Sequence, residues 1–381
     1  MYTRNIALPS NHSFFLFGPR GTGKSTLIKD RYPDSIYIDL LDFATYNRLL
    51  ANPHLLETFI PKNFDKYIII DEVQRIPELL NEVHRLIESQ YKYKFILTGS
   101  SARKLKSQGV NLLAGRAYTY HLYPLTAIEL GADFDLAKAL KVGLLPSNYD
   151  PNTDPERYLN SYITTYLKEE ILQEGLTRNI TAFAKFLEVA SFSVGSPLNM
   201  TAIARDVGIE RKVIENYFTI LEDLMIGIRL PVFSKGAKRK LINHPKFYYF
   251  DTGIFQTARP KGPLDSSQEI GGLALESLIF QNLNAINQNL DLKYQLYYHR
   301  TIAGAEVDFV AYGESGLIAI EVKHSRTWSA KDVSHLLAFK SEYPEAKLYL
   351  IYTGDQTNYY SNITILPATT ALTTLPHILS G

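Results

Sequence analysis

Short apolar runs recur along the first third of the chain and predict the strands of a sheet. They cover residues 14–17, 36–38, 67–70 and 95–97. None of them alternates with polar residues, as expected of central strands in a parallel sheet that is covered on both faces. A segment with apolar residues at helical spacing, 77–89, lies between the last two runs. The alternation of strands and helices predicts a doubly wound α/β domain near the N-terminus.

The middle of the chain has the apolar spacing of helices. A stripe over residues 155–175, rich in Tyr, Leu and Ile, predicts a helix that packs in a core. Another helix is expected over 199–208, because Asn199 is a suitable N-cap and Gly208 can end the helix. Each of these helices therefore has a face that must be buried against a neighbour.

The segment after the helix at 199–208 predicts a helix-turn-helix. After a very short turn, apolar spacing predicts a further helix over residues 210–225. Two strands are expected next, at 229–233 and 247–250, joined by a loop at 234–246. Helix, tight turn, helix and β-ribbon in this order predict a winged helix-turn-helix.

The last third of the chain predicts a second α/β unit. It begins with a helix that contains Leu275, Glu276 and Leu283. The elements that follow are expected in the order strand, strand, strand, helix and strand, at residues 294–298, 306–312, 317–322, 332–343 and 347–352. The whole pattern predicts three modules, namely an α/β domain over 1–130, a helical region with the winged helix over 131–265, and a second α/β domain over 266–381.

Composition excludes several classes of protein. Of the 381 residues, 45% are apolar and 21% are charged, so a mainly disordered chain is excluded. Cysteine is absent, which excludes disulfide frameworks, zinc fingers and cysteine nucleophiles. The 40 Lys and Arg nearly balance the 39 Asp and Glu, so any nucleic-acid surface must be a local patch. With no signal-peptide layout and no apolar run near the ~20 residues that span a bilayer, we expect a cytoplasmic, soluble protein without a membrane partner.

A complete phosphate-binding motif follows the first predicted strand. Residues 18–25 match G-x-x-x-x-G-K-[ST] and lead into a helix, which is the context that the motif requires. The glycines let backbone N–H groups surround phosphate oxygens, Lys24 is suited to the β- and γ-phosphates, and the Ser25 hydroxyl to Mg²⁺. The alternative is a Gly-rich turn that binds nothing. We expect ATP and Mg²⁺ as cofactors, bound by Gly18, Pro19, Arg20, Gly21, Thr22, Gly23, Lys24, Ser25 and Thr26.

The third apolar run ends in two carboxylates, Asp71 and Glu72. Asp71 can hold Mg²⁺ through water, and Glu72 can polarise a water that attacks the γ-phosphate. This pair favours hydrolysis over mere storage of the nucleotide. The alternative is that acidic residues simply end the strand at the surface.

Polar residues also follow the fourth run. Thr98 and Ser100 lie at the end of a strand that is expected between the other two, where a hydroxyl can sense the γ-phosphate. Arg103 and Arg116 lie downstream, and either can supply a transition-state arginine in cis or in trans. The alternative is a pair of solvated arginines on a helix or loop.

These blocks resemble a known family. Residues 17–25, 70–77, 97–101 and 113–116, together with 124–129, are similar to the AAA-type ATPases of the AAA_14 group, which carry a C-terminal region called DUF4143. That family is similar in turn to archaeal ATPases of the STAND type. The resemblance implies an additional-strand, catalytic-Glu P-loop fold. It also implies that Glu72 is the hydrolytic residue and that Thr98 or Ser100 is the sensor, whereas Arg116 as the arginine finger is only weakly indicated.

The predicted winged helix is locally basic. Residues 199–246 hold nine Lys and Arg against five Asp and Glu, and the loop 234–246 has five basic residues and no acid. Such a loop beside a helix-turn-helix suits phosphate contacts. Glu210 and Glu215 lie among the basic residues of the second helix, which argues against reading of base sequence. The alternative is a packing or protein-contact module.

Carboxylates and a lysine gather in the last module. Asp308 begins one predicted strand, and Glu321 ends the next, with Lys323 on the same face as Glu321 because strand side chains alternate. With Glu276 on the preceding helix, these residues resemble the PD-(D/E)xK nuclease core, in which Asp308 and Glu321 hold Mg²⁺ and Glu276 and Lys323 complete the catalytic set. The alternatives are an inactive DNA-binding relic of that fold and a chance match.

Three functional hypotheses follow. The favoured one is an ATP-hydrolysing protein, with Lys24 and Glu72 in catalysis, whose nucleotide cycle gates a DNA-binding or DNA-cleaving nuclease-like domain. The second is an ATP-dependent DNA-binding switch that never cuts. The third is a protein-interaction ATPase without nucleic acid, which predicts no salt-dependent binding of DNA. ATP or ADP and DNA are the expected partners, and a homo-oligomer fits the AAA-type resemblance.

Overall fold

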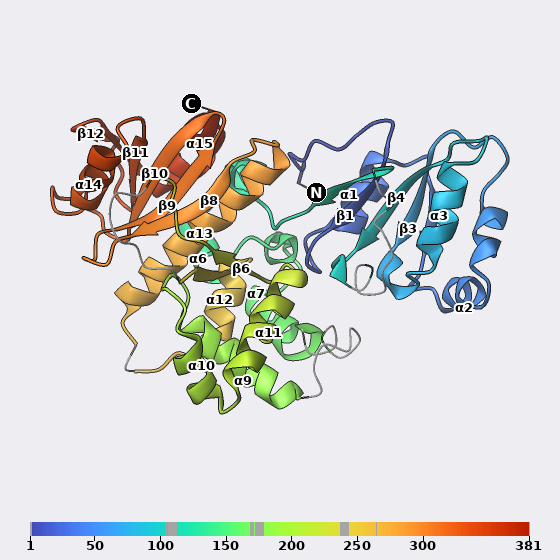
Figure 1. Ribbon diagram of the computed structural model, residues 1–381, viewed down its shortest axis with the longest axis horizontal. Coiled ribbons are helices and arrows are strands. Elements are labelled where there is room, and N and C mark those ends of the chain that lie inside the picture. Colours follow the sequence, from blue (N-terminus) through green and yellow to red (C-terminus); the bar gives the residue numbers. More distant parts are fainter. Residues whose placement is uncertain are drawn as a thin grey trace. The chain divides into compact units, whose positions relative to one another are not determined.

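The chain forms two compact units in a computed structural model. The model describes residues 2–103, 105, 113, 115–167, 171, 179–236, 244–263 and 265–380. The nucleotide unit, as we name it, comprises Ile6–Tyr123 and Asp223–Met225. The C-terminal unit comprises Met1–Asn5, Pro124–Glu222 and Ile226–Gly381 (Figure 1). The second and third predicted modules thus lie in one compact unit, and a boundary between them at residue 265 stays a prediction.

A five-stranded parallel sheet forms the centre of the nucleotide unit. The order of its strands is β2-β3-β4-β1-β5, and every neighbouring pair is parallel. The strands are β1 (Ser13–Phe17), β2 (Ile36–Asp39), β3 (Tyr67–Asp71), β4 (Lys94–Gly99) and β5 (Ala117–His121). The first four confirm the strands expected from the apolar runs. β4 lies between β1 and β3, which is the additional-strand order that the resemblance implies.

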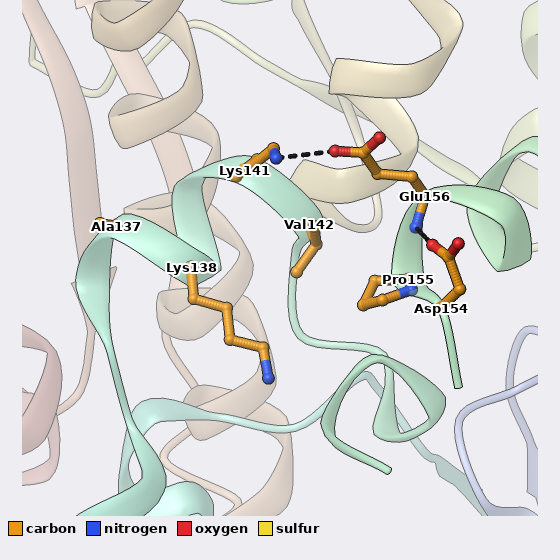
Figure 2. A pocket seen from close by; sticks show the side chains of 7 residues that line it. All are labelled: Ala137, Lys138, Lys141, Val142, Asp154, Pro155 and Glu156. Atoms are coloured by element: carbon orange, nitrogen blue, oxygen red, sulfur yellow. Dashed lines mark hydrogen bonds and ion pairs between the residues drawn. The ribbon is translucent and has the colours of Figure 1, made fainter. Parts of the chain in front are cut away.

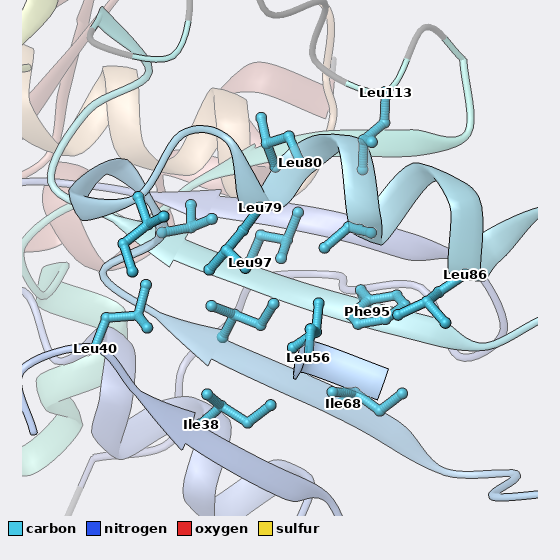
Figure 3. Packing of buried hydrophobic residues seen from close by; sticks show 14 of the residues in the cluster. Ile38, Leu40, Leu56, Ile68, Leu79, Leu80, Leu86, Phe95, Leu97 and Leu113 are labelled. Carbon is cyan, nitrogen blue, oxygen red and sulfur yellow. The ribbon is translucent and has the colours of Figure 1, made fainter. Parts of the chain in front are cut away.

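Helices cover both faces of this sheet. They are α1 (Lys24–Arg31), α2 (Phe43–Ala51), η1 (Pro53–Phe59), η2 (Val73–Arg75) and α3 (Leu79–Ile87). Alternate strand residues face opposite sides. Ile68 and Phe95 pack with α3 (Figure 3), in a cluster to which α2 also contributes. Phe14 and Ile69 pack with α1 on the other side. Burial on both sides explains why the strands show no polar alternation.

The C-terminal unit begins with short helices. They are α5 (Ala127–Leu130), η3 (Gly131–Asp133), α6 (Leu136–Val142), η4 (Pro146–Tyr149), α7 (Pro155–Ser161) and η5 (Tyr162–Tyr166). η5 is a π-helical turn. The helix expected over 155–175 therefore starts as α7 and η5, and residues 168–170 and 172–175 of it lie outside the described part of the chain.

Two helices and two strands form close to where the sequence predicts them, and a winged helix-turn-helix stays a prediction. They are α10 (Met200–Val207), α11 (Arg211–Asp223), β6 (Gly227–Leu230) and β7 (Lys246–Tyr249). The helices α9 (Ile180–Ser191) and α12 (Thr252–Ala258), on either side of them, were not predicted. Asn199 caps α10 by accepting from the N–H of Ala202 at 3.0 Å, and Gly208 ends it with a φ of 83°. β6 and β7 pair antiparallel. Most of the loop between them, residues 237–243, lies outside the described residues.

A six-stranded mixed sheet completes this unit. Its order is β12-β13-β11-β10-β9-β8. Its elements are α13 (Ser267–Asn289), β8 (Gln295–Arg300), β9 (Glu306–Gly313), β10 (Gly316–Lys323), α14 (Ser334–Glu342), β11 (Lys347–Tyr352), β12 (Asn358–Tyr360), β13 (Ile363–Pro367) and α15 (Ala368–Ser380). Phe309 of β9 stacks on Phe280 of α13, and α14 packs on β9 and β10. No helix among the described residues is both long and apolar enough to cross a membrane.

A buried carboxylate joins three segments of the C-terminal unit. Asp251 is fully buried and caps α12 by accepting from the N–H of Gly253 at 2.9 Å. It also accepts from the N–H of Leu144, after α6, at 2.7 Å and from Nε2 of Gln281, on α13, at 3.0 Å. Burial raises the pKa of Asp251 from 3.8 to about 6, against these hydrogen bonds, which lower it.

Replacement of Asp251 by Asn should change how stability depends on pH. Because the folded chain binds the proton more tightly than the unfolded chain, this carboxyl contributes stability below about pH 4 that is lost as the pH rises to about 6. Over that window the unfolding free energy of the wild type should fall relative to Asp251→Asn by up to about 3 kcal/mol. Urea unfolding at several pH values measures this. Parallel curves for the two proteins would contradict it, and Asp135→Asn, at the exposed cap of α6, is the control.

Candidate functional site

The phosphate loop connects β1 with α1 at the carboxyl edge of the parallel sheet. Gly21 and Gly23 have φ angles of 81° and 89°, which favour glycine. A side chain at Gly18 would place its Cβ 2.3 Å from the carbonyl oxygen of Leu122, so this glycine is required by close packing. The glycine spacing of the motif therefore fits the backbone of this loop.

The side chain of Lys24 folds back over the phosphate loop. Its side chain is buried, and Nζ donates to the carbonyl oxygens of Gly18 at 2.6 Å and Pro19 at 3.2 Å. Thr22 Oγ1 also donates to the carbonyl of Pro19, at 2.9 Å. The ammonium group is thus held where the loop curves, which is the position from which it can meet phosphate oxygens.

Asp71 collects hydroxyl donors from three elements. Ser25 Oγ, at the start of α1, donates to Asp71 Oδ2 at 2.9 Å. Tyr37 on β2 donates to the same oxygen, and Thr98 on β4 donates to Oδ1. Burial, together with Asp71, raises the pKa of the Tyr37 hydroxyl, so it stays protonated and donates. Sequence reasoning missed Tyr37, because nothing local relates the middle of β2 to the end of β3.

The oxygen atoms at this point suit a magnesium ion. Mg²⁺ prefers oxygen ligands and is commonly held by one or two protein groups together with water and substrate phosphates. Ser25 Oγ and the Asp71 carboxylate are 2.9 Å apart and meet this description. No group of three or more His, Asp or Glu within the described ranges forms a metal site, so a cage made by the protein alone is not found there.

Glu72 is held in an unusual backbone conformation beside these groups. Its φ of 62° lies in the left-handed region, which costs a residue with a side chain about 1 kcal/mol. Its N–H donates to Thr98 Oγ1 at 3.2 Å. Backbone strain of this kind is common at functional sites, where a side chain has to be held in one orientation. The structure thus brings Glu72 together with Thr98, and their roles as hydrolytic residue and sensor stay predictions.

Gln74 connects Glu72 with the end of β4. Its Nε2 donates to Glu72 Oε2 at 2.5 Å and to Ser100 Oγ at 3.3 Å. Gln74 is buried, and a Cβ at Gly99 would lie 2.3 Å from its Oε1, so this glycine makes room for the amide. Sequence reasoning missed Gln74 too, although a polar residue three positions after Asp71 was a signal.

Arg116 lies away from this cluster. Arg116 precedes β5, whose Ala117 pairs with Ser13 at the start of β1, whereas the phosphate loop follows the other end of β1. It forms an ion pair with Glu88, and Arg103 forms one with Asp223. Arg116 therefore does not meet the phosphate loop of its own chain, and its role as an arginine finger stays a prediction that requires another copy of the chain.

A second cluster of charged groups lies in the C-terminal unit. Glu276 of α13, Asp308 of β9 and Glu321 of β10 come together there, as predicted. The cation among them is Lys246 of β7, which the sequence did not single out for this role. Its Nζ lies 2.6 Å from Glu306 Oε1, 3.1 Å from Glu276 Oε1 and 3.3 Å from Asp308 Oδ1.

The protonation of this cluster reflects its burial. Burial raises the pKa of Glu276 to about 7, and Lys246 only partly offsets this. Burial, followed by Asp308, raises the pKa of Glu321 well above its usual value. For Lys246 burial acts in the opposite direction, but the surrounding carboxylates, Glu276 first, outweigh it and raise the pKa of the ammonium group well above 10.5. The lysine is therefore charged at neutral pH.

Lys323 does not join the carboxylates. Its Nζ pairs with Asp332 Oδ1 at 2.9 Å, in the segment before α14, and its side chain is 47% exposed. The convergence of Lys323 with two acids that the strand alternation predicted is thus not found, because the last residue of β10 turns to a nearer acid outside the sheet.

Three arginines of the predicted helix-turn-helix form ion pairs. Arg205 pairs with Asp206, Arg211 with Glu215, and Arg229 with Glu222. Lys212 is exposed at the start of α11. The wing residues Lys238, Arg239 and Lys240 lie outside the described residues, so their contribution to a DNA surface stays a prediction.

A pocket of about 440 Å³ lies elsewhere in the C-terminal unit (Figure 2). It is lined by residues of α6 and of the start of α7. Lys141 and Glu156 form an ion pair of 2.7 Å across it. It contains none of the predicted site residues.

Comparison with known proteins identifies three segments. Residues 10–131 match the AAA_14 model, described as an AAA domain. Residues 133–265 match DUF8612 and residues 271–371 match DUF4143, both described as domains of unknown function. An uncharacterized protein of Haemophilus influenzae is 21% identical over 91% of this chain and 90% of its own length.

Solved structures give weaker matches. A DNA polymerase III gamma subunit-related protein from Thermotoga maritima is 11% identical, covering 57% of this chain and 93% of its own, with a TM-score of 0.22. Protein VC1899 from Vibrio cholerae is also 11% identical, covering 91% of this chain and 97% of its own, with a TM-score of 0.23. Both TM-scores are too low for a shared fold to follow. With the phosphate loop, Asp71 and Glu72 at one edge of a parallel sheet, and with matches to both models at its two ends, the chain belongs to the AAA_14/DUF4143 family.

Proposed function

We propose that this protein hydrolyses ATP at the carboxyl edge of the sheet in its nucleotide unit. The observation that carries the proposal is the convergence on Asp71 of hydroxyl donors from the phosphate loop and from β4, with Glu72 as the next residue. A loop that only bound a phosphate would not need a strained glutamate beside this carboxylate. The match of residues 10–131 to an AAA domain supports the same activity.

The loop residues bind and orient the nucleotide. Lys24 Nζ already faces the acceptors of its own loop, Gly18 O and Pro19 O, and phosphate oxygens replace these as its partners. Backbone N–H groups at the start of α1 add positive potential. Ser25 and Asp71, the latter through water, would hold Mg²⁺, which supplies charge that offsets the β- and γ-phosphate oxygens. Tyr37 keeps Asp71 oriented through its hydroxyl.

Glu72 takes up the proton of the attacking water. As the water oxygen bonds to the γ-phosphorus, the bond to the bridging oxygen of ADP breaks, and a carboxylate oxygen of Glu72 accepts the proton. Thr98 holds the Glu72 backbone, and Gln74 holds its side chain. Because Gln74 also bonds to Ser100, the position of Glu72 is linked to the end of the sensor strand.

Glu72→Gln should abolish turnover and retain nucleotide. The amide cannot accept the proton, so phosphate release should fall by on the order of 10²–10⁴-fold, while the Kd for ATP changes little. Phosphate release and the binding of a fluorescent ATP analogue measure the two quantities. Lys24→Ala is the comparison, because it should weaken binding as well. Unchanged turnover in Glu72→Gln would remove Glu72 from the mechanism.

Gln74→Leu should lower kcat with little change in KM. The variant keeps the size of the side chain but no longer restrains Glu72, and a loss of about 1.4 kcal/mol in transition-state stabilisation lowers kcat about tenfold. Steady-state kinetics separates kcat from KM. Gln90→Leu, at an exposed position after α3, is the matched control and should match the wild type. A rise in KM with kcat unchanged would mean that Gln74 supports binding instead.

DNA binding by the helix-turn-helix region, controlled by the nucleotide, is a second candidate function. Its specific support is the order of α10, a tight turn, α11 and the β6–β7 ribbon, with Lys212 exposed at the start of α11. The ion pairs of Arg205, Arg211 and Arg229 reduce the charge available to phosphates. This region therefore favours weak contacts with the DNA backbone over reading of base sequence.

Binding of a labelled DNA duplex should weaken as salt rises. If four phosphates are contacted, the slope of log K against log salt is about −3 to −4, and ATP should shift the Kd. Fluorescence anisotropy over a salt series, with and without ATP, measures both. Lys212→Ala should reduce the slope by about one. Absence of binding at low salt would favour the third hypothesis, a protein-interaction ATPase without nucleic acid.

A further inference from the structure

We infer that the ammonium group of Lys246 takes the place of a metal ion in the carboxylate cluster of the C-terminal unit, so that this cluster holds no divalent cation and cleaves no phosphodiester. The inference goes beyond the proposed hydrolysis of ATP and does not depend on it. It concerns Glu276, Asp308 and Glu321, three residues of the nuclease-like pattern.

The ammonium group lies against Asp308, one of the two carboxylates that the nuclease-like pattern assigns to a metal ion, and against Glu276. Lys246 Nζ contacts Glu276 Oε1 at 3.1 Å and Asp308 Oδ1 at 3.3 Å, the oxygens of two different elements of the pattern. A Mg²⁺ or Ca²⁺ ion bound to the same oxygens would lie about 2.0–2.6 Å from each. It would compete with Nζ for the same space and repel its positive charge. The donor set therefore does not fit the implied metal while Lys246 is in place.

Burial of the side chain and pairing of the backbone both hold Lys246 in place. Its side chain is 1% exposed. In the β6–β7 ribbon it is paired with Leu230, and a bridge joins it to Pro197. The preceding residue, Pro245, accepts from the N–H of Leu198 at 2.9 Å. Withdrawal of the ammonium group would require this edge of the ribbon to leave its neighbours.

The ribbon itself is attached to the C-terminal sheet. After β6, the N–H of Phe233 donates to the carbonyl of Tyr298 on β8 at 2.7 Å, and the N–H of Tyr298 donates to Pro231 O at 3.0 Å. Tyr298 OH also bonds to the carbonyl of His244, two residues before Lys246. Backbone hydrogen bonds between the ribbon and the C-terminal sheet thus position Lys246 beside the carboxylates.

The remaining acids and cations agree with a structural ion cluster. Glu306 adds a fourth carboxylate, at 2.6 Å from Lys246, and is paired with Arg300 at 2.9 Å, so two cations of the chain lie against the acids of this cluster. Tyr248 donates to Glu276, which occupies a further ligand position. The lysine that nuclease chemistry would need, Lys323, pairs with Asp332. The cluster therefore joins the ribbon to the sheet through charge.

Binding of Mn²⁺ tests the inference directly. Full-length protein without nucleotide is titrated with Mn²⁺, and free ion is followed by electron paramagnetic resonance, all in an Asp71→Asn background that removes the phosphate-loop site. We expect Mn²⁺ binding to be the same with and without Asp308→Asn. Binding that is lost with Asp308→Asn would show a metal in the cluster and overturn the inference.

Removal of the lysine provides the second arm. Lys246→Met keeps most of the side-chain volume and removes the charge, so it should gain one Mn²⁺ per chain, and Lys246→Met/Asp308→Asn should lose it again. Thermal unfolding should show a lower Tm for Lys246→Met that Mn²⁺ raises, with no such rise in Lys246→Arg. A folded Lys246→Met that gains no Mn²⁺ would overturn the idea that the ammonium group stands in for a metal. If this variant does not fold, Mn²⁺ binding with and without Asp308→Asn still tests whether the cluster holds a metal ion.

Discussion

A charge that is removed from water has to be met by hydrogen bonds or by an opposite charge, and this constraint organises the chain at three places. Asp71, Asp251 and Lys246 are all buried. Each collects partners from segments that are far apart in sequence. Asp251 joins the end of α6 to α12 and α13, and Lys246 joins β7 to α13 and β9. An unpaired charge at any of these positions would cost several kcal/mol, so the elements that supply the partners are held in place.

The groups that surround a buried charge differ between Asp71 in the nucleotide unit and Lys246 in the C-terminal unit. Asp71 is met by neutral hydroxyl groups, from Ser25, Tyr37 and Thr98, and these can rearrange when a cation and phosphates arrive. Lys246 is met by carboxylates, so its charge is already balanced. The first arrangement is suited to take up a charged ligand, and the second already contains its cation. The two clusters of acids therefore differ in the partners that already surround them, although both resemble metal sites in sequence.

Most elements of the fold could be predicted, and the exceptions have physical reasons. β1, β3 and β4 are buried on both faces, so their apolar runs are plain in the sequence, and β2, which is only partly buried at an edge, still has a short apolar run. β5 is an edge strand with exposed Tyr118 and Thr119, and its mixed pattern does not indicate a strand. β12 is another edge strand, of three residues, and α15 contains Pro376, which argues against a helix in sequence terms. β5 and β12 form because each pairs with one neighbouring strand, and α15 forms because its apolar residues are buried.

The sequence by itself determined the local chemistry of this protein. The glycine spacing of residues 18–25, the adjacent Asp71 and Glu72, and the cap of α10 at Asn199 all follow from residues within a few positions of one another. Only the tertiary structure decided which charges meet. It placed Gln74 against Glu72 and Ser100. It put Arg116 at the end of β5 that is remote from the phosphate loop. It also placed Lys246, and not Lys323, beside Asp308, which lies 62 positions away in the sequence. Periodicity indicates which face of an element is buried, but the partner of a buried charge depends on strand order and pairing, which no local pattern contains.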